Sequence, residues 1–157
     1  MTLRTYQSAD LEQIVRLFHD TVHAVCIRDY SKEQVDAWAP AAIDLQAWDS
    51  SLSAHNTLVA VEGDAIIGFA DMDNTGYLDR LYVHLDHQRR GIATALYDRL
   101  EDECPADSLT THASLTARPF FEQRGYRVVK TQEVERHSVR LTNFVMEKRK
   151  KSPPNML

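Results

Sequence analysis

Residues 86–96, DHQRRGIATAL, combine two arginines, a glycine and the start of an apolar run with helical spacing. The first turn of a helix carries backbone N–H groups without partners inside the helix, and the positive end of the helix dipole lies there. Gly91 has no Cβ, so a ligand can approach the backbone closely, and Arg89 and Arg90 add positive charge. This stretch therefore predicts an anion-binding site, with phosphate as the preferred anion.

Two better-known phosphate-binding motifs are absent from the chain. It has neither the G-x-G-x-x-G pattern of dinucleotide-binding folds nor the G-K-[ST] of a P-loop. A short loop of small residues is a weak signal when taken alone, so a solvated loop remains one alternative. A nucleotide-binding module that uses Arg89 and Arg90 remains another.

The elements that must position this loop follow from hydrophobic periodicity and turn residues. We predict strands at 2–6, 56–62, 65–73, 77–85, 108–114, 126–132 and 138–148. We predict helices at 8–26, 30–40, 91–103 and 116–125, with a further helical turn or two at 44–52. The three strands in the middle of the chain are joined by short turns, which indicates an antiparallel meander. The order predicts an α+β fold with a mixed sheet and helices on its faces.

Length and composition favour one soluble domain. The chain has 157 residues, and we assign 1–148 to a single domain and 149–157 to a flexible tail that is basic and then proline-rich. The net charge of −5 argues against a nucleic-acid partner. The N-terminus lacks the apolar segment of a signal peptide, and no apolar run approaches the length of a membrane span. Two separated cysteines fit a reduced, cytoplasmic protein without membrane attachment.

The loop belongs to a pair of sequence motifs that occur in a characteristic order along the chain. The strand DRLYVH precedes the loop QRRGIA, and the later segment ASLTARPFFEQRGY spans 113–126. Together they resemble the GNAT superfamily of acyl-CoA-dependent N-acetyltransferases, whose signature Q/R-x-x-G-x-G/A follows such a strand and whose second marker reads A-x-x-F-[YF]-E-x-x-G-[FY]. The element order also matches over nearly the whole chain. The resemblance implies a mostly antiparallel sheet of about seven strands, about four flanking helices, and a central parallel strand pair that splays apart.

The resemblance also implies how acetyl-CoA, the acetyl donor, is held. Backbone N–H groups of residues 88–94 would bind the pyrophosphate of coenzyme A, and the strand at 81–83 would pair with the pantetheine arm. The Val83 N–H would point at the thioester carbonyl. The implied cofactor contacts are Leu81, Tyr82, Val83, Gln88, Arg89, Arg90, Gly91, Ile92, Ala93, Thr94, Ser114, Ala117, Phe120 and Phe121.

The implied reaction is attack of an amine on the thioester, and it needs a base but no metal. In the strand YLDRLYV, the period of two puts Tyr77, Asp79, Leu81 and Val83 on one face. Asp79 is then our candidate base, with Asp71 on the preceding strand as a second. Both carboxylates could equally be solvated groups beside turns.

Two positions depart from the family pattern. Tyr77 occupies the place where many members have a glutamate, and Phe121 the place of the usual general-acid tyrosine. A thiolate is not very basic, so water could protonate the leaving group. Tyr82 and His112 are alternative donors.

In the resembled fold the first two helices help to form the acceptor pocket. Asp29, Tyr30 and Trp38 could grip a cationic or aromatic acceptor, together with Asp71, although Trp38 could instead be a core residue. We predict an acetyltransferase that acts on an amine of a small molecule or a protein, with a homodimer as one possible assembly. The alternative is a non-catalytic acyl-CoA sensor on the same fold, which Phe121 makes plausible.

Overall fold

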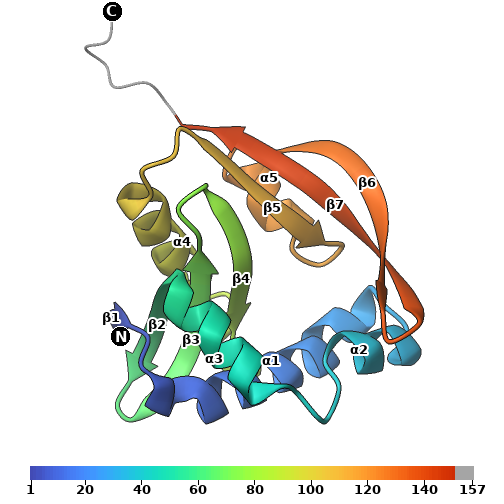
Figure 1. The fold of residues 1–157 in the computed structure, drawn as a ribbon, viewed down its shortest axis with the longest axis horizontal. Helices are drawn as coiled ribbons and strands as arrows, with labels where there is room; N and C mark the ends of the chain where they lie inside the picture. The colour runs from blue at the N-terminus through green and yellow to red at the C-terminus, as the bar shows by residue number, and fades with distance from the viewer. Residues whose placement is uncertain (151–157) are drawn as a thin grey trace, which may run out of the picture.

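A single twisted sheet of seven strands runs through residues 1–150, the part of the chain that the computed structural model describes (Figure 1). The strand order is β1-β2-β3-β4-β5-β7-β6, and every neighbouring pair is antiparallel except β4 and β5. The strands are β1 (Thr2–Thr5), β2 (Asn56–Glu62), β3 (Ala65–Met72), β4 (Tyr77–Val83), β5 (Ser108–Ser114), β6 (Arg127–Arg136) and β7 (Val139–Arg149). The predicted α+β sheet with a central parallel pair is confirmed.

Helices cover both faces of the sheet and divide the core in two. They are α1 (Leu11–Val25), α2 (Lys32–Trp38), α3 (Leu45–Ala54), α4 (Ile92–Glu103) and α5 (Arg118–Gln123). Apolar side chains of α1, α2 and α3 pack in one buried cluster, and those of α4 and α5 pack in the other. The described residues thus contain five α-helices where the sequence predicted about four, because 44–52 forms most of a full helix.

The sequence signals for helix starts act as expected at α2 and α4. Ser31 and Gln34 form a reciprocal capping box at the start of α2, with bonds of 3.1 and 2.9 Å. Gly91 is the N-cap of α4 and has φ +77°, a left-handed conformation that glycine adopts without strain. The turn before α4 therefore has the backbone form that its glycine predicts.

One prediction about β4 is wrong. The register of β3 against β4 shifts, so that Asp71 faces Arg80 while Met72 faces Leu78, which leaves Asp79 as an extra, bulged residue. Leu78, Leu81 and Val83 consequently all reach the same core cluster, although regular alternation would put Leu78 on the opposite face from Leu81 and Val83. The regular alternation that would put Tyr77, Asp79, Leu81 and Val83 on one face is broken at the bulge.

The parallel pair β4–β5 is short. Only Tyr77 with Thr110 and Leu78 with Thr111 are in register, and beyond them the two strands diverge (Figure 1). The predicted splay is therefore present. It leaves one side of β4 without a strand partner from Asp79 onward.

Some element ends differ from the sequence prediction. β6 continues to Arg136, four residues beyond the predicted end, and β7 includes Arg149, which was assigned to the tail. Lys150, also assigned to the tail, donates its N–H to the Asp107 carbonyl at 2.9 Å, and the rest of the predicted tail, 151–157, lies outside the described residues. Within 1–150, no helix is long and apolar enough to cross a membrane.

Candidate active site

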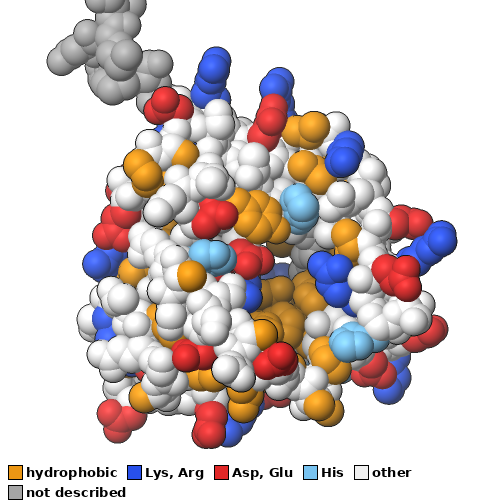
Figure 2. Space-filling model, in the orientation of Figure 1, with side chains coloured by type: hydrophobic (Ala, Val, Ile, Leu, Met, Phe, Trp, Pro, Cys, Tyr) orange, Lys and Arg blue, Asp and Glu red, His pale blue; other side chains and the backbone are white. Residues whose placement is uncertain are grey.

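The gap between β4 and β5 opens into a cavity of about 340 Å³. Figure 2 shows it as a hollow in this face, with hydrophobic side chains inside and charged and histidine side chains around the rim. Elements from both halves of the chain line it. Lining residues are Phe18, Tyr30, Trp38, Trp48, Tyr77, Leu78, Asp79, Arg80, Leu81, Tyr82, Thr111, His112, Ala113, Ser114, Ala117, Phe121, Val134, Arg136, Leu141, Thr142 and Asn143.

The backbone of β4 presents free groups to this gap. The His84 N–H donates to the Ile67 carbonyl of β3 at 2.8 Å, and antiparallel pairs alternate between bonded and non-bonded positions. Leu81 and Val83 fall on the alternate positions, so their N–H and C=O groups point away from β3. Leu81 lines the cavity, whereas Val83 is buried and lies outside the cavity lining. In agreement, the Val83 carbonyl accepts its bonds elsewhere, from the Thr21 hydroxyl (3.0 Å) and the Gln88 side chain (2.6 Å).

The start of α4 lies at the end of β4, as the anion-binding prediction requires. The first N–H groups of a helix have no partner inside it, here those of Gly91, Ile92, Ala93 and Thr94. A Cβ placed on Gly91 would find no atom within 4 Å, so the turn faces open space. This open cradle with convergent donors fits a phosphate.

The polar side chains of loop residues 88–90 differ in their contacts, although the sequence suggested a common role in anion binding. Gln88 turns back to the Val83 carbonyl, and Arg90 pairs with Glu62 at 3.0 Å. Arg89 is exposed and has φ +62°. Arg124, which the sequence did not single out, bonds the Thr94 hydroxyl and lies 3.6 Å from Asp98 in the first turns of α4. It therefore adds positive charge beside the cradle.

The opposite wall of the gap is made by the end of β5 and by α5. Ser114, Ala117 and Phe121 line the cavity, and the Ser114 hydroxyl accepts from the Ala117 N–H at 3.0 Å. Phe120 lies outside the lining and packs under Arg124. Phe121 is buried against the ring of Tyr126, with centroids 5.2 Å apart. No hydroxyl is present on this wall at the Phe121 position.

Asp79 and Asp71 occupy different environments. Asp79 lines the cavity with its side chain one-third exposed. Asp71 is fully buried behind it and bonded to Arg80 and His55, each at 2.7 Å, and burial raises the pKa of its carboxyl group. Asp71 therefore lies outside the cavity lining and is not placed to contact an acceptor directly.

Two of the three acceptor candidates on the early helices reach the cavity. The rings of Tyr30 and Trp38 line it and meet edge to face, with centroids 5.4 Å apart. Asp29 is exposed outside the lining, where it accepts a bond from the Thr116 hydroxyl at 2.7 Å. His112 lines the cavity and meets the ring of Tyr77 edge to face at 5.2 Å.

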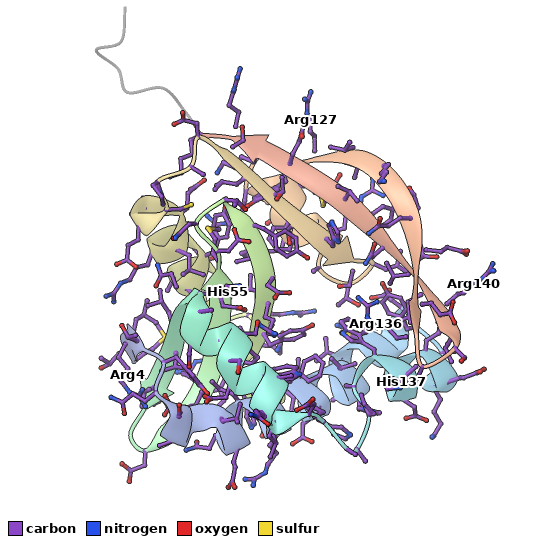
Figure 3. All side chains as sticks on the ribbon, viewed as in Figure 1. Arg4, His55, Arg127, Arg136, His137 and Arg140 are labelled. Atoms are coloured by element: carbon purple, nitrogen blue, oxygen red, sulfur yellow. The ribbon has the colours of Figure 1, made fainter. Side chains whose placement is uncertain are left out.

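Several lining residues escaped the sequence analysis. Phe18 and Trp48 read as ordinary apolar positions of helices, yet their rings continue the aromatic wall at a centroid distance of 4.8 Å. Asn143 of β7 and Arg136 of β6 also line the cavity, although the sequence analysis singled out neither. Arg136 lies at the end of the β6–β7 hairpin beside the early helices (Figure 3). No local sequence pattern predicts that Arg136 reaches the cavity, because this contact depends on where the hairpin lies in the fold.

A central parallel strand pair that splays beside a glycine-capped helix defines the acyltransferase class of fold. The family model described as "Acetyltransferase (GNAT) domain" matches residues 26–148, and the chain belongs to this family of acetyltransferase enzymes. It is 36% identical over 144 residues to "Uncharacterized N-acetyltransferase YafP" of Escherichia coli K12, covering 92% of this chain and 93% of the relative.

Solved structures agree with the family assignment. A GCN5-related N-acetyltransferase from Rhodopseudomonas palustris is 34% identical, with a TM-score of 0.90 and 94% of each chain covered. The fold is shared at 18% identity with yncA, a putative acetyltransferase from Salmonella typhimurium solved with acetyl-CoA, with a TM-score of 0.71 over 100% of this chain and 99% of that one. The PaiA N-acetyltransferase from Thermoplasma acidophilum, solved with coenzyme A, is 17% identical, with a TM-score of 0.73 over 95% and 98% of the chains.

Proposed function

We propose that this protein transfers the acetyl group of acetyl-CoA directly to a primary amine of a small molecule or a protein, within a ternary complex. The observation that carries the proposal is the gap between β4 and β5. The two strands diverge beyond Leu78 and Thr111, the carboxylate of Asp79 lines the cavity between them, and the open turn at Gly91 follows β4 in the chain.

Coenzyme A fits this gap in one direction. Its pyrophosphate suits the N–H groups that follow Gly91, with positive charge from Arg89, Arg90 and Arg124 nearby. Its pantetheine arm can pair with the backbone of Leu81 and Val83, as an added strand would. The thioester then lies toward the closed end of the gap, where β4 and β5 meet at Leu78 and Thr111. The structures of two relatives, solved with coenzyme A and acetyl-CoA, support this assignment.

The reaction forms a C–N bond and breaks a C–S bond. As the amine attacks, negative charge develops on the thioester oxygen, and a fixed N–H donor stabilises it. The Leu81 N–H points away from β3 and lies nearer to the closed end, so it can supply this donor, whereas Val83 lies at the open end of β4 and outside the cavity lining. Coenzyme A leaves as a thiolate and takes its proton from water, because Phe121 has none to give.

Asp79 is the proposed base that takes the proton of the attacking ammonium. It is the carboxylate among the cavity-lining residues of the described chain, and the bulge of β4 places it beside the closed end of the gap. The amine reaches it through a space walled by Phe18, Trp38, Trp48 and Tyr82, so the acceptor body meets mainly aromatic rings.

The first test compares thermal unfolding with acetyl-CoA, coenzyme A and ATP. A ligand at one hundred times its Kd stabilises the fold by about 2.7 kcal/mol, which shifts the melting temperature by several degrees. We expect a shift with acetyl-CoA but not with ATP. Equal shifts with both would contradict the coenzyme A assignment and favour a general nucleotide site.

A second candidate function follows from Phe121. Without a proton donor at this position, the protein could bind acyl-CoA as a sensor and not turn it over. Release of free thiol from acetyl-CoA, followed across a panel of amines, separates the two functions. Amine-dependent thiol release is expected of the transferase, whereas binding with no release from any amine would establish the sensor.

A further inference from the structure

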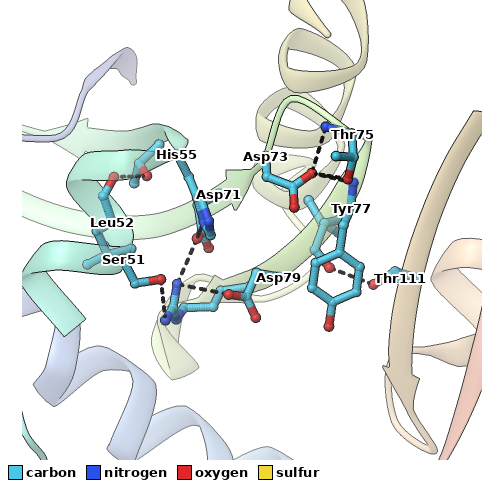
Figure 4. Close-up of polar contacts among 12 residues, drawn as sticks. Ser51, Leu52, His55, Asp71, Asp73, Thr75, Tyr77, Asp79 and Thr111 are labelled. Atoms are coloured by element: carbon cyan, nitrogen blue, oxygen red, sulfur yellow. Dashed lines mark hydrogen bonds and ion pairs between the residues drawn. The ribbon is translucent and has the colours of Figure 1, made fainter. Parts of the chain in front are cut away.

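Four side chains from α3, β3 and β4 form a chain of contacts that ends at Asp79 (Figure 4). Asp71 on β3 is fully buried, and its Oδ2 accepts from His55 Nδ1 and from the Arg80 guanidinium, both at 2.7 Å. Arg80 also lies 3.4 Å from Asp79 Oδ2. The same guanidinium thus joins a carboxylate in the core to one in the cavity wall.

Contacts on several sides fix the orientation of the Arg80 guanidinium. Its second terminal nitrogen donates to the Ser51 hydroxyl at 3.2 Å, and its guanidinium lies 4.6 Å from the ring centre of Trp48. Its side chain is only 15% exposed. A planar guanidinium with fixed donors in two directions holds one orientation, which a flexible ammonium does not.

The bulge explains why two adjacent residues can share this network. Regular β4 geometry would send Asp79 and Arg80 to opposite faces of the sheet. With Asp79 bulged, Arg80 stays opposite Asp71 while both side chains reach the cavity. A bulged residue has lost its ladder partner, so its side chain needs another support to keep one direction.

We propose that His55 and Asp71 are positioning residues that act through Arg80 to fix the carboxylate of Asp79 toward the acceptor amine. This inference rests on the proposed function, in which Asp79 is the base. His55 reaches neither the cavity lining nor the cofactor gap, so it acts through the network alone.

The network has a physical reason to stay ordered. A buried carboxylate is costly unless charged and hydrogen-bonded partners compensate it, and Asp71 has both in His55 and Arg80. Its other oxygen, Oδ1, is buried without a partner, so Oδ2 carries both bonds. Loss of the His55 donor would leave Arg80 as the main partner of Asp71 and pull it from Asp79.

The test is the kinetics of His55→Leu, with His55→Asn as the conservative variant, because the asparagine amide places an N–H near the position of Nδ1. We expect His55→Leu to lower kcat by about ten- to hundredfold through misplacement of the base, with KM and Kd for acetyl-CoA within about twofold. His55→Asn should recover most of the rate. His19→Leu is the matched control, since His19 also lies near an aspartate, Asp20 at 3.4 Å, but outside the cavity.

Arg80→Lys is a second variant in case His55→Leu does not fold. It keeps a cation for Asp71 but loses the second terminal nitrogen that bonds Ser51 and the planar group that lies over Trp48. The orientation that brings Nη1 near both carboxylates is then no longer fixed, so kcat should fall in the same way. Unchanged kcat in whichever of these two variants folds would overturn the inference. Parallel losses of kcat, acetyl-CoA binding and melting temperature would do so as well, because they would show a structural role only.

A double-mutant cycle tests the positioning role of His55 separately from the proposed role of Asp79 as the base. If His55 acts through Asp79, His55→Leu should change kcat little once Asp79→Asn is present. Additive effects would overturn the positioning role and leave Asp79 as the base. A normal rate for Asp79→Asn alone would instead remove the base assignment, and the inference with it.

Discussion

The hydroxyl of Tyr30 donates to the Thr142 carbonyl at 2.6 Å and accepts from the Leu115 N–H at 2.9 Å. One side chain from the early helical region therefore ties the β6–β7 hairpin to the end of β5. Both polar functions of the hydroxyl are used by the protein itself, so Tyr30 offers its ring, and not its hydroxyl, to the cavity.

We expect Tyr30→Phe to weaken the fold more than the reaction. The variant removes two bonds and leaves the Leu115 N–H without its acceptor, so the free energy of unfolding should fall by about 2 kcal/mol. The KM for the amine should change by less than about threefold, because the ring remains. Urea denaturation and steady-state kinetics measure the two effects. A large rise in KM with unchanged stability would mean that the hydroxyl contacts the acceptor.

The ion pair of Arg4 and Asp10 predicts a pH-dependent part of the stability. Hydrogen bonds from Arg4, at 2.8 and 2.9 Å, hold the pKa of Asp10 below its usual value. A carboxyl with a lowered pKa in the folded state stabilises the fold above its unfolded pKa, and this contribution is lost as pH falls through the folded pKa.

Asp10→Asn should therefore lower the free energy of unfolding by about 2 kcal/mol at pH 7, and the difference should shrink at acidic pH. Urea denaturation of both proteins between neutral and acidic pH measures it. Asp36→Asn, which removes an exposed partner of Lys32, is the control and should give no resolvable change. A deficit that stays constant with pH would contradict the ion-pair origin.

Local signals predicted much of this fold. Short turns between apolar runs marked the three central strands, and Gly91 marked the turn before α4. The capping box of Ser31 and Gln34 begins the helix predicted at 30–40. Each of these depends on residues close together in the chain. The proposed cofactor contacts on β4 and on the turn before α4 could be predicted from the sequence for the same reason.

The acceptor side of the candidate site was harder to predict from the sequence, because it is assembled from segments that lie far apart in the chain. The bulge at Asp79 arises from pairing with β3, so the sequence YLDRLYV alone reads as regular alternation. Asp71 reads as a strand carboxylate, and only the fold brings His55 and Arg80 to it. Arg136 reaches the cavity through the placement of a hairpin, which no spacing rule predicts.

Gly91→Glu should abolish most acetyl-CoA binding. The added side chain enters the open cradle at the start of α4, and its charge repels the pyrophosphate, so Kd should rise by at least about tenfold. Gly63→Glu is a matched control, since Gly63 has φ +62° and also faces open space, but lies in the β2–β3 turn. Calorimetric titration measures both. Equal affinities for wild type and Gly91→Glu would show that the cofactor binds elsewhere.

Asp79→Asn should lower kcat by about 10²- to 10⁴-fold, the usual contribution of a general base, with Kd for acetyl-CoA unchanged. Asp102→Asn, an exposed change on α4, controls for loss of surface charge. A kcat equal to that of the wild type would remove Asp79 from the role of base.

Phe121→Tyr restores the hydroxyl that the family pattern has at this position. The ring is buried at the cavity wall, so the new hydroxyl must either reach the cavity or lose its hydrogen bonds to water, and the second outcome destabilises the fold by about 1–3 kcal/mol. Melting temperatures of the two proteins distinguish these outcomes.

If water protonates the leaving thiolate well enough in the wild type, the restored hydroxyl should raise kcat by less than about threefold, because a thiolate with a pKa near 8.5 is a good leaving group. Thiol release measured with a fixed amine tests this. A rise well above about tenfold would show that proton supply limits the native protein. Turnover seen only in the variant would mean that Phe121 makes this chain a sensor.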